Sequence, residues 1–351
     1  MITLRNLIIN ICAVFIRDKR KRRTFRGKYK AKSIDAKLNE LYSIVQSVRD
    51  LEMERSLTFR VAPLNDSPPS GPSSQVFLAI ACTAKNEAPY LKEWIEYHRI
   101  VGVERFYFYD NESDDDTKEV LEPYVKDGVV VYHHLPNHPI TGQRQQTEAY
   151  EDAIFKYRDR TRWLALIDVD EFIVPVEKDS IPDFLADYEQ YPAVVANWVC
   201  FDSNGHDRKP TANGGLVTAN FTRARKDHNL DTKLTEGDDR HVKSIVNPKQ
   251  VVKCLTPHHA LYYRNYVAVT ENFEGTRGDI TRRHSTVRIR INHYQTKSRE
   301  EYANKVSRNY KGSQNVYRLN EDMINFRDAT ADDLIIQKYI PRLKAVMGIT
   351  D

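Results

Sequence analysis

A short apolar run that ends in closely spaced carboxylates constrains this chain more than any other feature. Trp163–Ile167 has strand length, and Asp168, Asp170 and Glu171 follow it at once before apolar residues resume. A buried strand ending in Asp-x-Asp places two hard oxygen ligands at the carboxyl end of a sheet, where open α/β sheets bind ligands. Carboxylates this close together need a cation or a proton to compensate them. An acidic strand end in water is the simpler interpretation until other segments are considered.

The composition limits the class of protein. The chain has 351 residues, of which 40% are hydrophobic and 29% charged, as in soluble globular proteins. Its net charge of +4 is unevenly distributed: Arg5 and ten Lys/Arg against one Asp between residues 17 and 32 leave residues 33–351 at −6. Such a mildly acidic body argues against nucleic-acid binding. The four cysteines form no C-x-x-C pair, which is typical of reduced core thiols in an intracellular protein.

The first 32 residues are predicted to be an attachment segment. Residues 1–16 are apolar but shorter than the roughly 20 residues that span a bilayer. The basic cluster Lys19–Arg23 follows the apolar run, whereas a secretory signal would place positive charge before it. We therefore predict that residues 1–32 bind an anionic membrane surface and that the protein is cytoplasmic, peripheral to the inner face of the membrane. A disordered basic arm is the alternative.

Three further segments are predicted around the main domain. Residues 33–60 are a helix whose apolar positions follow 4-3-4-3 spacing over two heptads, so it docks on the body or pairs in a weak dimer. The composition of residues 61–74, rich in Pro and Ser, is that of a linker. The main domain then covers residues 75–310, and residues 311–351 form a helical tail at the C-terminus.

Alternating strands and helices begin at Gln75. The predicted strands are Val76–Cys82, Arg105–Tyr109, Val129–Tyr132 and Trp163–Ile167, and the helices are Pro89–Val101, Thr117–Lys126 and Gln143–Arg158. Such alternation indicates an α/β fold with a parallel sheet covered on both faces. No G-x-G-x-x-G follows the first strand and no G-x-x-x-x-G-K-[ST] occurs, which disfavours dinucleotide and P-loop proteins.

The alternation ends after Pro175, where histidines accumulate between short strands. The predicted strands are Ala193–Val199, Leu216–Arg223, Val251–Cys254, Tyr263–Val269 and Val287–Ile291. A last helix runs from Ser298 to about Tyr310 and starts with an S-x-x-E capping box of Ser298 and Glu301.

Five segments in this order resemble glycosyltransferase family 92 in its bacterial form. They are KNEAPYLKEWIEYHRIVGVERFYFYDNESDD, RWLALIDVDEF, NWVCFDSNGH, KSIVNP and INHYQTKSREEYANKV. The resemblance covers about Phe77 to Tyr310 and implies a GT-A fold: a Rossmann-like nucleotide-sugar-binding parallel sheet followed by a mixed acceptor half. It also implies a metal-dependent, inverting enzyme that moves a hexose, with galactose favoured, from a UDP-sugar donor to a glycan or lipid-linked glycan acceptor.

The resemblance assigns metal and phosphate ligands. A divalent cation would stabilise negative charge on the leaving diphosphate, and Mn²⁺ or Mg²⁺ takes carboxylate and water ligands, with Mn²⁺ also accepting imidazole. Asp168, Asp170 and His293 are the metal candidates. In GT-A enzymes the first Asp usually faces the ribose and the second holds the metal. Lys297 is expected to reach the diphosphate; a solvated lysine at the helix start is the alternative.

The uridine pocket is predicted in the loops that follow the first two strands. The candidate residues are Lys85, Asn86, Glu87, Asp110 and Asn111, because these loops lie above the carboxyl ends of neighbouring strands. Asn and Asp in loops are often turn-formers, which is the competing interpretation. Arg144, at the start of the helix after the third strand, is expected to touch nucleotide or diphosphate.

The general base and the class of reaction stay open. An inverting transfer needs a carboxylate that deprotonates the acceptor hydroxyl; Asp238 and Asp239 are preferred over Asp202 and Glu236, and a solvated acidic loop is the alternative. One rival function is an inactive, membrane-tethered binding module with the same fold. The other is a haloacid-dehalogenase-type phosphohydrolase, which the residues after Asp-x-Asp disfavour.

Overall fold

The computed structural model describes residues 76–136, 143–225, 239–310, 324 and 330–350. The chain divides into two units. One unit comprises Met1–Phe59 with Asn137–Gln145, and the other comprises Arg60–Pro136 with Gln146–Asp351. The segments predicted for membrane attachment, for the helix of residues 33–60 and for the linker lie outside the described residues. Among the residues that are described, no helix combines the length and apolar character that crossing a bilayer requires.

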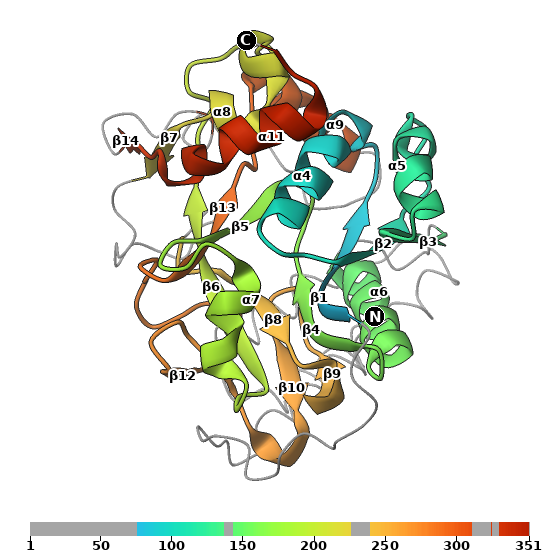
Figure 1. Ribbon diagram of the computed structural model, residues 1–351, viewed down its shortest axis with the longest axis vertical. Helices are drawn as coiled ribbons and strands as arrows, with labels where there is room; N and C mark the ends of the chain where they lie inside the picture. Colours follow the sequence, from blue (N-terminus) through green and yellow to red (C-terminus); the bar gives the residue numbers. More distant parts are fainter. Residues whose placement is uncertain (1–75, 137–142, 226–238, 311–323, 325–329, 351) are drawn as a thin grey trace, which may run out of the picture. The chain divides into compact units, whose positions relative to one another are not determined.

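A parallel four-stranded half forms the first part of the main sheet (Figure 1). Its strands are β1 (Val76–Ala84), β2 (Arg105–Asp110), β3 (Val130–His134) and β4 (Thr161–Leu166). They are ordered β3-β2-β1-β4, and every neighbouring pair is parallel. The four strands predicted from the sequence are therefore confirmed to within a few residues at each end.

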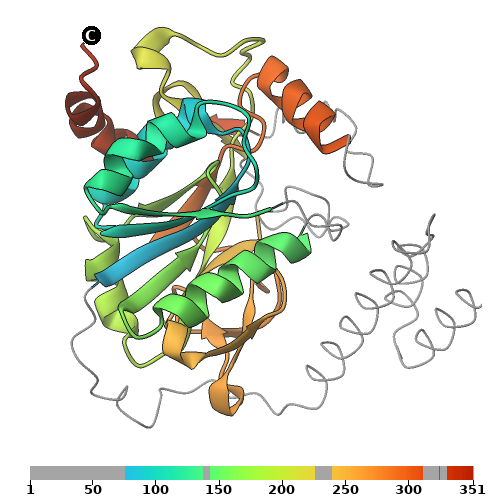
Figure 2. The ribbon, with the colours of Figure 1, turned by 90° about the vertical axis from the view of Figure 1, so that its right-hand side faces the viewer.

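Helices cover both faces of this half. They are α4 (Ala88–Ile100), α5 (Thr117–Lys126) and α6 (Gln143–Tyr157). Figure 2 shows α4 and α5 on one face and α6 on the other. Alternate residues of β1 divide between them, since Leu78 and Ile80 pack in the core that contains α4, whereas Ala79 and Ala81 pack in the core that contains α6. The sheet is thus buried on both faces, as predicted.

The second half of the sheet is mixed. Strand β8 (Val242–Val246) lies antiparallel between β4 and β6 (Ala193–Cys200). Strand β13 (Ile289–His293) is parallel to β6 and antiparallel to β5 (Glu171–Pro175). The sheet continues through β11 (Ala268–Val269) and β12 (Gly275–Thr276), and two small sheets pair β9 (Val251–Cys254) with β10 (Ala260–Tyr262) and β7 (Arg223–Arg225) with β14 (Thr330–Asp332). The predicted fold class, α/β with the GT-A succession of a parallel and a mixed half, is confirmed.

Two predicted strands are wrong because tertiary contacts decide the local structure. Val217–Asn220, inside the predicted strand Leu216–Arg223, is the short helix α8. The buried carboxylate of Glu93 accepts hydrogen bonds from the backbone N–H groups of Val217 and Thr218, at 2.7 and 2.9 Å, and so caps this helix.

The second wrong strand is Tyr263–Val269, which begins as the 3-10 helix η4 (Tyr263–Asn265). The left-handed backbone of Arg264 and Asn265, at φ 57° and 61°, prevents strand geometry there. Only Ala268–Val269 of the predicted strand pairs in the sheet. Strands β5 and β8 were not predicted at all.

The remaining elements surround the sheet. They are α7 (Ile181–Leu185), η1 (Ala186–Tyr188), η2 (Ala212–Gly215), η3 (Pro248–Gln250), α9 (Arg299–Tyr310), η5 (Ile335–Tyr339) and α11 (Ile340–Met347). The capping box predicted for α9 is confirmed, since Ser298 Oγ donates to Glu301 Oε2 at 2.6 Å and accepts from the Glu301 N–H at 3.3 Å. Within residues 311–351, the described part holds β14, η5 and α11, and the ring of Tyr339 packs edge-on against Tyr97 of α4.

Candidate functional site

The Asp-x-Asp segment forms the tight connection between β4 and β5. Strand β4 ends at Leu166 and β5 starts at Glu171, so Asp168 and Asp170 lie at the carboxyl edge of the parallel half. Strand β13 returns to the same place from the second half, because His293 is the register partner of Glu171 on β5 and of Cys200 on β6. The two predicted metal-binding regions are therefore brought together.

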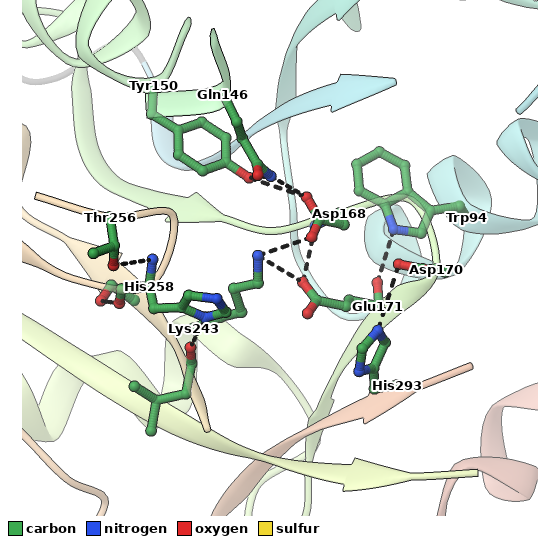
Figure 3. A network of polar contacts seen from close by, with 12 residues as sticks. Trp94, Gln146, Tyr150, Asp168, Asp170, Glu171, Lys243, Thr256, His258 and His293 are labelled. Atoms are coloured by element: carbon green, nitrogen blue, oxygen red, sulfur yellow. Dashed lines mark hydrogen bonds and ion pairs between the residues drawn. The ribbon is translucent and has the colours of Figure 1, made fainter. Parts of the chain in front are cut away.

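Helix α4 fixes the start of β5. Trp94 Nε1 donates to the carbonyl oxygen of Glu171 at 2.8 Å (Figure 3), and the hydroxyl of Tyr97 donates to that of Ile173 at 3.1 Å. Nε2 of His98 accepts from the Ile173 N–H at 3.2 Å, which leaves Nδ1 to donate to the Trp94 carbonyl at 2.8 Å. Burial lowers the pKa of His98 to about 3, so the ring keeps this neutral form.

Lys243 of β8 compensates the carboxylate of Asp168. Its Nζ lies 2.9 Å from Asp168 Oδ2 and 3.5 Å from Glu171 Oε2 (Figure 3). Gln146 and Tyr150 of α6 donate to the other oxygen of Asp168. The side chain of Lys243 is only 1% exposed. Burial alone would lower its pKa, but the carboxylates of Asp168 and Glu171 raise it above the usual value, so Lys243 is a permanent cation.

Glu171 is held in place by the same arrangement. Its side chain is fully buried, and Oε2 accepts from the backbone N–H of Asp168 at 2.9 Å. Burial raises the pKa of Glu171 to about 8, because the attraction of Lys243 does not offset the loss of hydration and the nearby Asp168 adds to the rise. Glu171 thus stabilises the turn. The side chain of Asp168, by contrast, is about one third exposed.

Asp170 faces a different set of partners. Its Oδ2 accepts from Lys305 Nζ of α9 at 2.5 Å, and its Oδ1 lies 3.8 Å from His293 Nε2. Burial alone would raise the pKa of Asp170, but the charges of Lys305, His293 and Lys297 hold it well below its ordinary value. Burial lowers the pKa of His293 to about 4 despite the attraction of Asp170, so the imidazole is neutral at pH 7. An ionised carboxylate and a neutral imidazole therefore meet here.

This pair fits a divalent ion. Among the described residues no three His, Cys, Asp or Glu side chains gather in a metal-binding group. Mn²⁺ accepts one carboxylate and one imidazole, and such ions commonly complete their coordination with water and substrate phosphates. The Nε2 side of the His293 ring faces Asp170, whereas Nδ1 is buried without a hydrogen-bond partner. Asp170 and His293 are the residues that would hold the ion. Asp168 is compensated by the buried Lys243, whereas Lys305 beside Asp170 is partly exposed.

The loops after β1 and β2 interlock. Asn86 Oδ1 accepts from the Asp114 N–H at 2.9 Å, and the Asn86 N–H donates to Ser113 Oγ at 2.9 Å. Asp110 is buried and accepts from the Ser113 N–H at 3.0 Å, while the Asn111 N–H donates to the Ala84 carbonyl at 2.9 Å. The two predicted pocket loops are therefore adjacent. The turn-forming role of Asn86 and Asp110 is what the structure shows, and nucleotide binding by these loops stays a prediction.

Lys297 links the first of these loops to the C-terminal half. Its Nζ lies 3.9 Å from Glu87 Oε2 and 4.1 Å from the centre of the Tyr90 ring. Lys297 is only 6% exposed, so the alternative of a solvated lysine is wrong. Lys85, by contrast, is exposed.

The structure describes only some of the carboxylates predicted as general base. Asp239 is buried and accepts at 3.1 Å from the N–H of Cys200, which is the strand partner of His293, so a solvated loop is the wrong description for it. Asp238, Glu236 and the side chain of Arg144 lie outside the described residues. Asp202 pairs with Arg223 at 2.7 Å.

The two lysines of the site, Lys243 and Lys305, were not predicted. Lys243 is a charged residue inside a buried strand of the segment KSIVNP, and Lys305 ends the segment INHYQTKSREEYANK. A lysine within an apolar run was the available indication for Lys243, since a buried ammonium needs a carboxylate partner. Nothing local to α9 indicates that Lys305 meets Asp170, 135 residues away.

The fold and the site together define an α/β protein with carboxylate, imidazole and lysine side chains gathered at the carboxyl edge of its parallel strands. The family model described as glycosyltransferase family 92 matches residues 80–331. The chain therefore belongs to glycosyltransferase family 92, as predicted.

Curated relatives match parts of the chain. A family 92 protein of Oryza sativa subsp. japonica is 29% identical over 117 residues, 33% of this chain and 19% of the relative. One of Arabidopsis thaliana is 32% identical over 132 residues, 37% of this chain and 22% of the relative. Galactan beta-1,4-galactosyltransferase GALS2 of Arabidopsis thaliana is 29% identical over 129 residues, 34% and 25% of the two chains. The chain spans a quarter or less of the length of these relatives.

Solved structures show weaker similarity. TarS 1-349 of S. aureus gives a TM-score of 0.34 at 11% identity, covering 77% of this chain and 72% of that chain. The mannosyltransferase PcManGT from Pyrobaculum calidifontis, in complex with GDP-Man and Mn2+, gives 0.26 at 17% identity, covering 44% and 42%. The family assignment rests on the sequence match alone.

Proposed function

We propose that this family 92 protein is a metal-dependent, inverting glycosyltransferase that moves a hexose from a UDP-sugar to a glycan or lipid-linked glycan. The observation that carries the proposal is the pair of Asp170 and His293, 3.8 Å apart at the carboxyl edge of the parallel strands, with Lys305 beside it. Galactose is the favoured sugar, because GALS2 is named a galactan beta-1,4-galactosyltransferase.

Different residues of the site bind different parts of the donor. Asp170 and His293 would hold the divalent ion, which would supply Lewis-acid stabilisation of negative charge on the diphosphate. Asp168, partly exposed and oriented by Lys243 and Gln146, faces the ribose. Lys297, placed by Glu87 and Tyr90, contributes a point charge to the diphosphate.

The acceptor must lose a proton as it attacks. In an inverting transfer one carboxylate takes that proton from the acceptor hydroxyl. Asp239 is the described candidate because its carboxylate lies at the carboxyl end of β6, next to the partner residue of His293. Asp238, its neighbour in the chain, is the second candidate.

Release of UDP tests the proposal. The full chain is incubated with UDP-galactose, UDP-glucose or UDP-N-acetylglucosamine, with Mn²⁺ or with chelator, and free UDP is measured. We expect release with UDP-galactose that requires the ion and is lost in Asp170→Asn. An inactive binding module would bind UDP without turnover of any donor. A phosphohydrolase would instead act on phosphate esters independently of UDP, and family membership leaves that alternative without support.

We also propose that residues 1–32 attach the protein to a membrane, because ten basic residues follow position 16 in this segment. Flotation with vesicles of phosphatidylglycerol should carry the full chain and leave a chain starting at residue 33 behind. Equal flotation of the two would contradict the proposal.

A further inference from the structure

Lys305 occupies the place beside Asp170 where a cation is needed. We infer that Lys305 makes binding of the divalent ion depend on the diphosphate of the donor, because its ammonium group exchanges between Asp170 and a phosphate oxygen. This inference rests on the proposed function and concerns a residue that the family resemblance did not assign. Lys305 of α9 then couples the binding of the divalent ion to the binding of the diphosphate.

The fold holds the ammonium group at the carboxylate. Lys305 Nζ lies 2.5 Å from Asp170 Oδ2 and 3.3 Å from the carbonyl oxygen of Gln295. Helix α9 is fixed at its start by the capping box and by the hydrogen bond from the Tyr90 hydroxyl to Glu301. Its apolar face packs in a small cluster of Tyr302, Val306 and Ile324, apart from the two cores that cover the sheet. The helix that places Lys305 beside Asp170 therefore packs outside the two main cores.

Charge makes the ammonium group and the ion competitors. Asp170 carries one negative charge, and Lys305 balances it when neither ion nor donor is present. An ion held by Asp170 and His293 would place two further positive charges next to that ammonium group, and like charges at such a distance repel strongly away from bulk water. The ion alone therefore binds against the opposition of Lys305.

The diphosphate removes this opposition. It brings negative oxygens that both the ion and an ammonium group bind. A lysine has a flexible four-carbon stem and three donors, and the side chain of Lys305 is 31% exposed, so it has room to turn from carboxylate to phosphate. The ion and the diphosphate then favour each other, and the coupling acts equally on both affinities.

A structural role for Lys305 makes different predictions. If Lys305 only ties α9 to the β4–β5 turn, replacing it lowers the melting temperature and leaves the affinity for the ion unchanged or weaker. Competition, by contrast, predicts that removing the ammonium group strengthens binding of the ion alone. The sign of this one change separates the two roles.

The experiment measures Mn²⁺ binding by electron paramagnetic resonance, with and without UDP, for the full-length wild type, Lys305→Met and Lys305→Gln. Lys126→Met is the matched control, because Lys126 is an exposed lysine that pairs with Glu122 of its own helix at 2.9 Å. We expect both Lys305 variants to bind Mn²⁺ alone roughly tenfold more tightly and UDP at saturating Mn²⁺ roughly tenfold more weakly, with the control unchanged. Unchanged or weaker Mn²⁺ binding in folded Lys305 variants would overturn the inference.

A second measurement uses the wild type only and so does not depend on how the variants fold. Reductive methylation followed by mass spectrometry reports how accessible the amine of Lys305 is. Mn²⁺ alone should increase its labelling by displacing it from Asp170, and UDP with Mn²⁺ should suppress the labelling; constant labelling rejects the exchange. A wild type that binds neither Mn²⁺ nor UDP would overturn the proposed function as well, whereas normal binding with unchanged variants overturns the role of Lys305 alone.

Discussion

The two aspartates of the β4–β5 turn lie two residues apart and are each paired with a lysine, yet the two pairs differ in kind. Lys243 comes from the buried strand β8, is 1% exposed and also contacts the buried Glu171. Lys305 comes from helix α9 and keeps 31% of its side chain exposed. The Asp168 side is a closed ion pair that shapes the turn. The Asp170 side is a pair that a ligand can open.

One motif therefore serves both stability and binding. A carboxylate that a buried lysine compensates permanently stabilises the turn and is not available to a metal ion. A charge compensated by a partly exposed lysine is stable without ligand and remains accessible to an ion. Substitutions at each pair should therefore separate effects on stability from effects on binding.

Removing the buried lysine should have the largest effect on stability. Lys243→Met leaves the carboxylate of Asp168 without its cation, and breaking a buried pair in this way costs about 3–5 kcal/mol. Urea unfolding measures the loss. The double variant Lys243→Met/Asp168→Asn should recover part of it, because the carboxylate left without its cation is then removed; no recovery would mean that Asp168 and Lys243 do not form the closed pair.

Neutralising each aspartate should separate activity from stability. Asp170→Asn should lose at least about a hundredfold in Mn²⁺-dependent release of UDP while melting within a few degrees of the wild type. Asp168→Asn should lower the melting temperature more, since it strands the buried Lys243. Thermal melts and UDP release on the same preparations give the comparison, and equal melting losses in the two variants would contradict it.

Stability should respond to pH through Glu171. The pKa of this carboxyl is raised to about 8 in the folded protein, so its contribution is full below the unfolded value of about 4.5 and is lost as pH rises towards 8. His258 and His293, with pKa values lowered to about 4, contribute above about 6.5 and lose that contribution as pH falls. Between pH 7 and 8 only Glu171 of these three changes stability. The free energy of unfolding should fall there, by at most about 1.4 kcal/mol per pH unit, and Glu171→Gln should flatten the fall.

The smallest expected effect is on the titration of His293. The ammonium group of Lys305 contributes to the lowered pKa of this ring, although burial contributes most. Lys305→Met should therefore raise the pKa of His293 from about 4, still below its usual value. Nuclear magnetic resonance of the histidine ring protons measures the shift, and Lys126→Met should leave the pKa where it is.

The sequence predicted the parallel half far better than the mixed half. Apolar runs such as Val76–Cys82 and helices such as Thr117–Lys126 are local patterns, and the structure reproduces them closely. Strand β8 was not predicted, because the charged Lys243 interrupts its apolar residues. This lysine can be buried there because it lies beside Asp168 and Glu171. Helix α8 exists because Glu93 caps it from a distant segment. Both elements depend on contacts between residues far apart in the chain, which hydrophobic periodicity does not indicate.

The candidate site follows the same rule. Asp168 and Asp170 stand out because a carboxylate pair at a strand end is unusual, and their joining with His293 through β5 and β13 agrees with the expectation. The compensating lysines come from segments 75 and 135 residues away from their aspartates. Their charge partners could be known only from the packed structure.

Mn²⁺ binding to His293→Gln tests whether Asp170 and His293 hold the ion. This variant leaves the pair of Asp170 and Lys305 intact and removes only the imidazole next to it. Titration followed by electron paramagnetic resonance, at saturating UDP, should show affinity for Mn²⁺ roughly 10- to 100-fold weaker than in the wild type, with an unchanged melting temperature. Wild-type affinity in this folded variant would contradict the claim that Asp170 and His293 hold the ion.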